Sequence, residues 1–365
     1  MHRKKKNKKI AKNRPVKEQT PLRGSRKLLW ALISVVLAAV SIWAVSEQAK
    51  NFSFRSFMEC IADANKFWLA AAVLAMLGFI GFEACALCSA CKALGYPTKF
   101  HRGFLYSSSD IYFSAITPSA IGGQPACAFL MMRNGIPGSV ATAVLLLNLA
   151  MYSSAILVIG LIGFLLRTGV FPNYNAVSKI LIIIGYICQI VLAFVFLMLV
   201  KNEHLLENIC TGAINVLGRL KHIKDKEKKL QNLRGKMEEY RLCTKLLAGQ
   251  KPLLAKSFLF NLLQRVSQLL VTVFVYMASG GRMAYAPDVL AMQSYAVIGS
   301  NCVPIPGAIG VTDYLMIDGL NAVLPSERTV EIELLSRSLS FYSCILLCGI
   351  VVLFSCRFKK KGTGK

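Results

Sequence analysis

Six apolar runs of bilayer-spanning length limit what this chain can fold into. A helix needs about 20 residues to cross the hydrocarbon core of a membrane. The chain is 55% hydrophobic and only 17% charged, whereas soluble proteins carry about 25% charged residues. The pattern therefore predicts an all-α polytopic membrane protein. The six predicted transmembrane helices lie at about residues 28–45, 67–91, 140–166, 176–200, 257–279 and 330–356.

Two further apolar regions are interrupted in the middle. Residues 103–132 are broken at 117–123, and residues 289–323 are broken at 304–310. Each break contains the pattern P-x-A-I-G, which disfavours a continuous helix. Irregular backbone at membrane depth is stable only where protein or a polar cavity surrounds it. We therefore predict two re-entrant helical hairpins whose tips meet near the midplane, with a pair of Pro-kinked ordinary helices as the alternative.

The distribution of positive charge tests this layout. The net charge is +25, and Lys and Arg concentrate in the tails 1–27 and 357–365 and in the loop 201–256. Positive residues flanking spans stay in the cytoplasm. All three segments are cytoplasmic only if both broken regions turn back. Six spans plus two oppositely inserted hairpins make residues 28–356 one membrane domain, an inverted repeat of halves 28–166 and 176–356.

Other local patterns have less specific interpretations. Ile223, Leu230, Leu233, Met237 and Tyr240 recur at helical spacing, which predicts an amphipathic helix on the cytoplasmic lipid surface or, alternatively, a solvated helical linker. The basic tails indicate membrane orientation rather than binding to nucleic acid. The Cys85, Cys88 and Cys91 run has no fourth thiolate nearby for an iron–sulfur cluster, so we interpret these residues as small packing residues.

The two predicted tips suggest a site for an anion. A new half-helix begins after each tip, and its free N–H groups and positive dipole end would point at the midplane. Two such ends facing one cavity would bind an anion, and in a membrane the natural anion is a lipid phosphate. The residues predicted to line this site are Thr117, Ser119, Gly122, Gly123, Gln124, Gly307, Gly310 and Thr312.

Ionisable residues inside apolar segments are costly and are candidates for function. Glu83 and Arg265 lie on equivalent spans of the two halves and could pair, either along a polar path or as a structural ion pair. Asp110 precedes the first tip. Asp313 follows the second tip, where it could gate the path or simply cap the half-helix.

Enzymatic chemistry has little support in the sequence. The four His residues lie in predicted tails or loops. The sequence contains no metal-ligand spacing, phosphate-binding loop or nucleophile elbow. We therefore expect no catalytic residue, no metal and no cofactor.

The two tip motifs resemble those of a known family. Residues 117–125 read TPSAIGGQP, and residues 304–313 read PIPGAIGVTD. They are similar to motifs of the membrane domain of the lysylphosphatidylglycerol synthase/flippase family, in a stand-alone form lacking the soluble synthase domain, over about residues 28–356. The chain departs from the family pattern at Ala308, Asp313 and Cys127, which bears on substrate identity more than on fold.

The resemblance implies movement of a phospholipid between the leaflets of a bacterial cytoplasmic membrane, with both termini cytoplasmic. An anionic or aminoacylated phospholipid is then the expected partner, alongside a possible partner synthase. Two alternatives remain open. One is a phosphatidylglycerol lysyltransferase, which would confer resistance to cationic antimicrobial peptides. The other is a lipid-binding membrane scaffold or regulator.

Overall fold

The computed structural model describes residues 58, 61–117, 120–202, 205–209, 211–212, 226–301, 303 and 305–358. The predicted first span at 28–45 lies outside these residues, and so do the N-terminal basic tail and residues 359–365 of the C-terminal one. Three residues of the tip motifs, namely Pro118, Ser119 and Pro304, also lie outside them.

The described chain is all-α, and no strand occurs in the described ranges. Five helical stretches are long and apolar enough to cross a membrane, and they confirm the second to sixth predicted spans. The last of these stretches, Arg328–Ser355, joins two α-helices through a π-helical segment, Ser338–Ser343. The helices involved are α4 (Lys66–Ala93), α7 (Gly138–Leu166), α8 (Ala176–Lys201), α11 (Lys251–Ala278), α14 (Ser326–Arg337) and α15 (Cys344–Phe358).

The first broken region is a helical hairpin. Helix α5 (Phe100–Ile116) and helix α6 (Gly123–Arg133) flank the predicted break. At the open end of the hairpin, Asn134 Nδ2 donates a hydrogen bond of 3.0 Å to Tyr106 Oη. Near the tip, Gln124 Nε2 donates to Asp110 Oδ2 at 2.7 Å. Asn134, just after α6, thus pairs with the first half of α5, whereas Gln124, at the start of α6, pairs with the second half. Helix α6 therefore runs back along α5.

The second broken region also turns back. It consists of α12 (Ala286–Ser300) and α13 (Val311–Leu320). Gly299 approaches Leu315 near the tip, while Gly319 approaches Met292 further down. Gly307 and Gly310 have φ of 61° and 83° in the tip, a backbone region that glycine adopts without steric cost. Both broken regions are therefore hairpins rather than continuous kinked helices.

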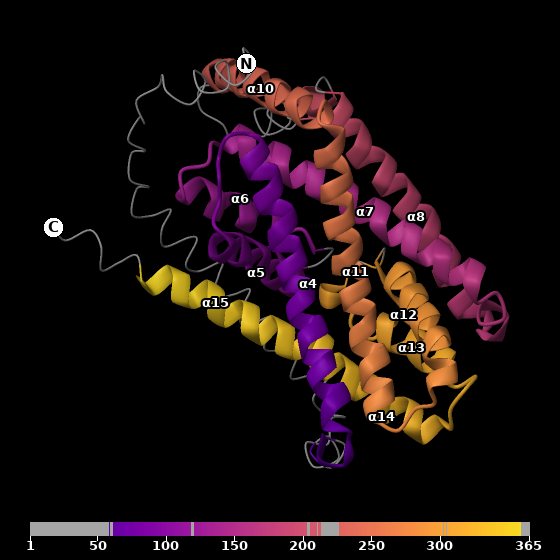
Figure 1. Ribbon diagram of the computed structural model, residues 1–365. Coiled ribbons are helices and arrows are strands. Elements are labelled where there is room, and N and C mark those ends of the chain that lie inside the picture. The colour runs from indigo at the N-terminus through magenta and orange to yellow at the C-terminus, as the bar shows by residue number, and fades with distance from the viewer. Residues whose placement is uncertain are drawn as a thin grey trace.

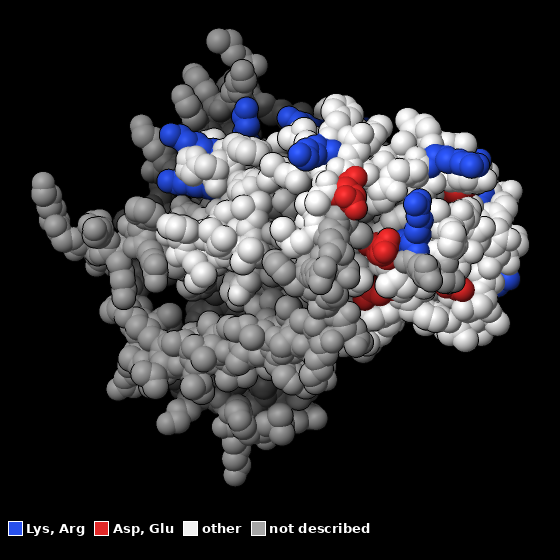
Figure 2. All heavy atoms as spheres, turned by 90° about the horizontal axis from the view of Figure 1, so that it is seen from below, with Lys and Arg blue, Asp and Glu red and all other residues white. Residues whose placement is uncertain are grey.

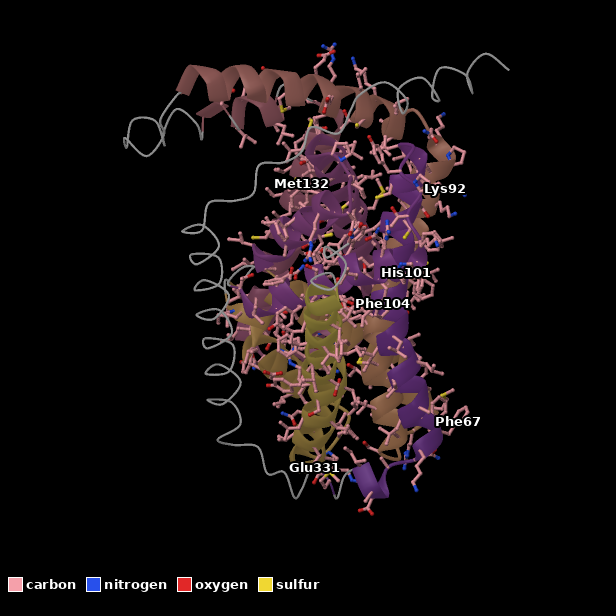
Figure 3. The ribbon with its side chains drawn as sticks, turned by 90° about the vertical axis from the view of Figure 1, so that its left-hand side faces the viewer. Phe67, Lys92, His101, Phe104, Met132 and Glu331 are labelled. Carbon is pink, nitrogen blue, oxygen red and sulfur yellow. The ribbon has the colours of Figure 1, made fainter. Side chains whose placement is uncertain are left out.

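The two hairpins enter the helical bundle from opposite ends. In Figure 1, α5 and α6 lie toward the end covered by α10 (Lys226–Ala248), whereas α12 and α13 lie toward the end formed by α14. Figure 3 shows Lys92 and Met132 at the α10 end and Phe67 and Glu331 at the other. Helices α4 and α11 pack side by side between them. This arrangement agrees with the predicted opposite insertion, while the inverted-repeat relation itself stays a prediction.

Helix α10 crosses one end of the bundle and packs on protein. Its Met237 and Tyr240 side chains are buried, and Tyr240 Oη donates to the Leu199 carbonyl oxygen at 2.8 Å. Ser139 Oγ of α7 donates to Glu239 Oε2 at 2.8 Å. Met237 and Tyr240 of the predicted apolar face are therefore buried against protein rather than lipid, where α10 contacts α7 and α8. The side chains of Ile223, Leu230 and Leu233 lie outside the described residues.

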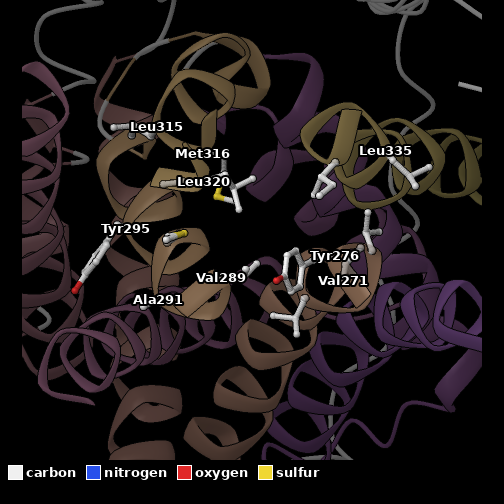
Figure 4. Packing of buried hydrophobic residues seen from close by; sticks show 14 of the residues in the cluster. Val271, Tyr276, Val289, Ala291, Tyr295, Leu315, Met316, Leu320 and Leu335 are labelled. Atoms are coloured by element: carbon white, nitrogen blue, oxygen red, sulfur yellow. The ribbon is translucent and has the colours of Figure 1, made fainter. Parts of the chain in front are cut away.

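Hairpin α12–α13 forms part of the larger buried core. Figure 4 shows how apolar side chains of α11, α12, α13 and α14 pack together there.

By contrast, the outer face of α8 exposes Ile180, Ile183 and Ile187. Exposed apolar area of this kind marks contact with a membrane or a partner. Figure 2, viewed from the end opposite α10, shows separate acidic and basic side chains among mostly uncharged ones.

The crossing of α8 and α12 depends on Gly185. A Cβ added there would overlap the Ile298 carbonyl oxygen and lie 2.8 Å from Gly299 Cα. We expect Gly185→Ala to destabilise the protein by about 2 kcal/mol, because backbone atoms cannot move aside cheaply. Thermal unfolding in detergent measures this effect. Gly169→Ala is the control, since nothing lies within 4 Å of its added Cβ. Equal or higher stability of Gly185→Ala would contradict the close crossing.

Candidate functional site

A polar cavity of about 480 Å³ lies between the two hairpin tips. Helices α4, α5, α7, α8 and α11 also contribute to its walls. The charged groups on its surface are Glu83, Asp110, Arg265 and Arg337. The amide side chains that line it are Gln124, Asn148, Gln189, Gln264, Gln268, Gln293 and Asn301. Such a concentration of amides in an apolar bundle provides donors and acceptors for a polar ligand.

The first tip is held together by its own Thr and Gly residues. Thr117 Oγ1 donates to the Phe113 carbonyl oxygen at 2.6 Å and accepts from the Gly122 N–H at 2.9 Å. A Cβ on Gly123 would overlap Asp110 Oδ1. Thr117, Gly122 and Gly123 therefore build the turn. Of the described residues of this first tip that were predicted for the site, only Gln124 lines the cavity. Ser119 lies outside the described residues.

The second tip is fixed to the last helical stretch. Asp313 Oδ2 accepts from the Gly310 N–H at 2.8 Å, and Asp313 Oδ1 lies 2.6 Å from Arg337 Nε. Arg337 also donates to the Gly307 carbonyl oxygen at 3.3 Å. Gly307 and Thr312 line the cavity, whereas Gly310 caps α13. Asp313 therefore caps the half-helix, as one of its two interpretations predicted, and its role in gating stays a prediction.

This capping changes the predicted anion site. The Asp313 carboxylate already accepts a hydrogen bond from the Gly310 N–H at the N-terminal end of α13. At the first tip, the Asp110 side chain lies beside Gly123, the first residue of α6. Carboxylates at helix N-termini complement the helix dipole. Both half-helix ends are thus next to carboxylates of the chain itself, and the positive charge offered to the cavity comes from arginine instead.

Arg265 is that arginine. Its side chain is 6% exposed, and its guanidinium lies 3.9 Å from the Tyr152 ring centroid and 5.2 Å from that of Phe79. Nη1 donates to Gln268 Oε1, and Nε has no partner in the described part of the chain. Cation–π contacts of this kind stabilise a guanidinium while leaving its charge intact. Arg265 therefore presents a buried positive charge to the cavity.

Glu83 does not pair directly with Arg265 among the described side chains. Glu83 Oε2 accepts from Ser107 Oγ at 2.9 Å and from Gln264 Nε2 at 3.0 Å. Sequence reasoning placed Glu83, Asp110 and Arg265 on one polar path, and all three line the cavity. The bond from Gln264 to Glu83 was not foreseen.

Arg337 is a site residue that sequence reasoning missed. It lies within the predicted span 330–356, so the rule that singled out Glu83 and Arg265 applies to it equally. Its guanidinium lies over the Phe341 ring at 4.9 Å. A π-helical segment follows directly at Ser338–Ser343, and such segments occur often at functional sites.

The cysteines do not form a metal site in the described part of the chain. Among the described residues, no group of three or more His, Cys, Asp or Glu side chains could hold a metal ion. Cys85, Cys88 and Cys91 are free thiols on α4, and Cys91 is part of a buried apolar cluster.

The fold and the cavity define a multi-pass α-helical membrane protein with two inward helical hairpins. More particularly, the chain belongs to the family described as the lysylphosphatidylglycerol synthase TM region, which matches residues 31–348. It is also 27% identical over 184 residues to the UPF0104 membrane protein PH1989 of Pyrococcus horikoshii. That match covers 48% of this chain and 54% of the relative, so the chain spans about half the length of this curated protein. The resemblance found in the tip motifs is confirmed.

Proposed function

We propose that this protein moves an anionic or aminoacylated phospholipid between the leaflets of the bacterial cytoplasmic membrane, with both termini cytoplasmic. The observation that carries the proposal is Arg265, a buried arginine without an ion-pair partner among the described residues, facing a polar cavity between two hairpin tips. A buried charge is costly unless it meets a counter-charge. A lipid phosphate is the counter-charge that a membrane supplies.

The surroundings of the cavity also suit a lipid. Ile121 and Ile305 line it at the two tips and are 71% and 41% exposed. Apolar groups at the edge of a polar cavity allow a head group to enter while the acyl chains stay in hydrocarbon. In this proposal the phosphate binds Arg265, and the amide side chains bind the polar remainder of the head group. Gly307 and Thr312 contact it from the second tip.

Synthesis of an aminoacylated lipid is the second candidate, because the family description refers to a synthase. Expression in a host that makes no lysyl-lipid separates the two. Lysyl-phosphatidylglycerol appearing in that host's lipid extract would favour synthesis. Its absence, together with lipid movement by the purified protein, supports translocation alone.

The translocation proposal is tested with purified protein in liposomes. Fluorescent phosphatidylglycerol, lysyl-phosphatidylglycerol and phosphatidylcholine report leaflet exchange when a membrane-impermeant reductant quenches the outer leaflet. We expect exchange of the first or the second lipid at least about tenfold faster than in protein-free liposomes, a difference of about 1.4 kcal/mol in barrier height. Folded protein that moves none of the three lipids would favour the scaffold alternative.

A substitution at Gln293 distinguishes the role of the cavity in lipid exchange from its role in the stability of the fold. It is buried, lines the cavity, and its Oε1 has no hydrogen-bond partner among the described residues. Replacing an unsatisfied polar group by an apolar one of similar size is neutral or stabilising. We therefore expect Gln293→Leu to keep or raise the melting temperature while slowing lipid exchange about fivefold, a loss of roughly 1 kcal/mol. A lowered melting temperature with normal exchange would show that Gln293 has a structural role instead.

A further inference from the structure

Two buried acids in the cavity remain unexplained by lipid binding alone. Glu83 of α4 and Asp110 of α5 are 3% and 7% exposed and line the same cavity. Ser107 and Gln264 donate to Glu83, and Gln124 donates to Asp110. Two ionised carboxylates buried in one cavity repel each other, so such a pair holds one proton.

The charged and titratable groups that face this pair are few. Arg265 faces it from α11 without contacting it, and Tyr152 of α7 lies against Arg265. Cys127 faces it from α6, and Cys344 faces Glu83 from α15. Arg337 of α14 also lines the cavity but is paired with Asp313, so among the described groups Arg265 is the cation left to balance the two acids. With one proton on the acid pair, the charges of the pair and of Arg265 sum to zero.

A second observation is that two buried acceptor oxygens beside the acids lack a hydrogen-bond donor among the described residues. Gln264 is 1% exposed, lines the cavity and donates to Glu83, yet its Oε1 has no partner among the described residues. Gln124 donates to Asp110, and its Oε1 is likewise buried without a partner. Both glutamine residues line the cavity. Buried acceptors of this kind are normally satisfied, often by water, and water is what would carry a proton to the pair.

We propose that Glu83 and Asp110 form a proton-binding site coupled to the lipid site at Arg265, so that one proton enters with each anionic lipid. This inference rests on the proposed function. When a phosphate binds Arg265, its negative charge favours a second proton on the pair. The proton comes from cavity water and forms an O–H bond on the remaining carboxylate. Both acids are then neutral, the phosphate is balanced by Arg265 while Arg337 stays paired with Asp313, and the proton leaves when the lipid leaves.

The first experiment detects the shared proton without any transport. Infrared spectroscopy of the purified protein at neutral pH reports the C=O stretch of protonated carboxyl groups. We expect this band to weaken in the double variant Glu83→Gln with Asp110→Asn, whose amides preserve the hydrogen-bond geometry. Glu333 is a further buried acid, 3% exposed, so Glu333→Gln identifies its contribution to the band. A band unchanged in the double variant would overturn the proton site.

The second experiment measures coupling in liposomes. One proton per lipid predicts that a difference of one pH unit across the membrane shifts the steady-state leaflet ratio of a trace fluorescent phosphatidylglycerol by up to about tenfold. The shift should disappear with a proton–potassium exchanger and in the double variant. Because a proton and an anionic lipid move together without net charge, an imposed membrane potential should leave the ratio of wild type unchanged. Glu331→Gln, an exposed site, is the matched control and should behave as wild type.

The outcomes separate this inference from the proposed function. Lipid movement that ignores the pH difference in wild type overturns the coupling and leaves translocation standing. Absence of lipid movement at every pH overturns translocation and, with it, the coupling. The infrared band then still decides whether the two acids hold a proton.

Discussion

Arg265→Gln is expected to slow the exchange of anionic lipid by on the order of 100-fold. Charge-assisted hydrogen bonds to a phosphate contribute about 1.5–3 kcal/mol each, and glutamine keeps a hydrogen-bonding end but loses the charge. Arg265→Lys should retain part of the activity, with exchange about tenfold slower. An ammonium keeps the charge but lacks the planar stacking that the Tyr152 ring offers to a guanidinium. Exchange assays in liposomes over a series of lipid concentrations measure both variants.

The control for Arg265 is a second arginine on the same chain. Arg282 is exposed, so Arg282→Gln removes the same charge without altering the cavity. Circular dichroism and melting temperature establish that each variant is folded. A folded Arg265→Gln protein that exchanges anionic lipid within threefold of wild type would remove the basis for the phosphate site.

Gly123→Val is expected to open the first hairpin. A side chain at this position would overlap Asp110 Oδ1 and Ser114 Oγ, and its Cβ would lie 2.6 Å from the Asp110 carbonyl oxygen. Helix α6 must therefore move away from α5, at a cost of about 3 kcal/mol or more. Cys127, which is fully buried in α6, should then react faster with a thiol reagent. Labelling followed by peptide mass spectrometry measures that change at a single cysteine.

The matched control is Gly235→Val, because nothing lies within 4 Å of a Cβ added at Gly235. Its labelling of Cys127 and its melting temperature should match wild type. If Gly123→Val leaves Cys127 as protected as in wild type, the close contact between α5 and α6 at the tip is wrong. Lipid exchange should be lost in the Gly123 variant together with the closed hairpin.

The positions of the two hairpins could be predicted from the sequence because their cause is local. Pro and Gly in an apolar segment interrupt helical hydrogen bonding wherever they occur, and the breaks fall where these residues cluster. The Asp313 cap could also be foreseen, since Gly310 and Asp313 are three residues apart. Apolar length likewise located the five described spans.

The internal organisation of the cavity could not be predicted in this way. Gln264 reaches Glu83 across 181 residues of sequence, and Arg265 lies against aromatic rings of α4 and α7. These contacts depend on how the helices rotate about their axes, which periodicity leaves open when a helix is apolar all round. For the same reason, the predicted pair of Glu83 and Arg265 is replaced by separate partners. Glu83 accepts from a hydroxyl and an amide, and Arg265 lies against aromatic rings and donates to Gln268.

The π-helical segment at Ser338–Ser343 has a consequence for how the last helix tolerates change in length. An α-helix advances about 100° per residue, and a π-helical turn accommodates one residue more than an α-helical turn. Deleting a residue here would therefore restore an α-helical turn and leave the helices on its two sides in nearly the same orientation. Deleting a residue from α14 or α15 would instead rotate one side by about that angle, so that Arg337 and the residues of α15 could not all keep their present partners. The last helical stretch can thus lose one residue in the π-helical segment, but not elsewhere, without turning one of its faces away.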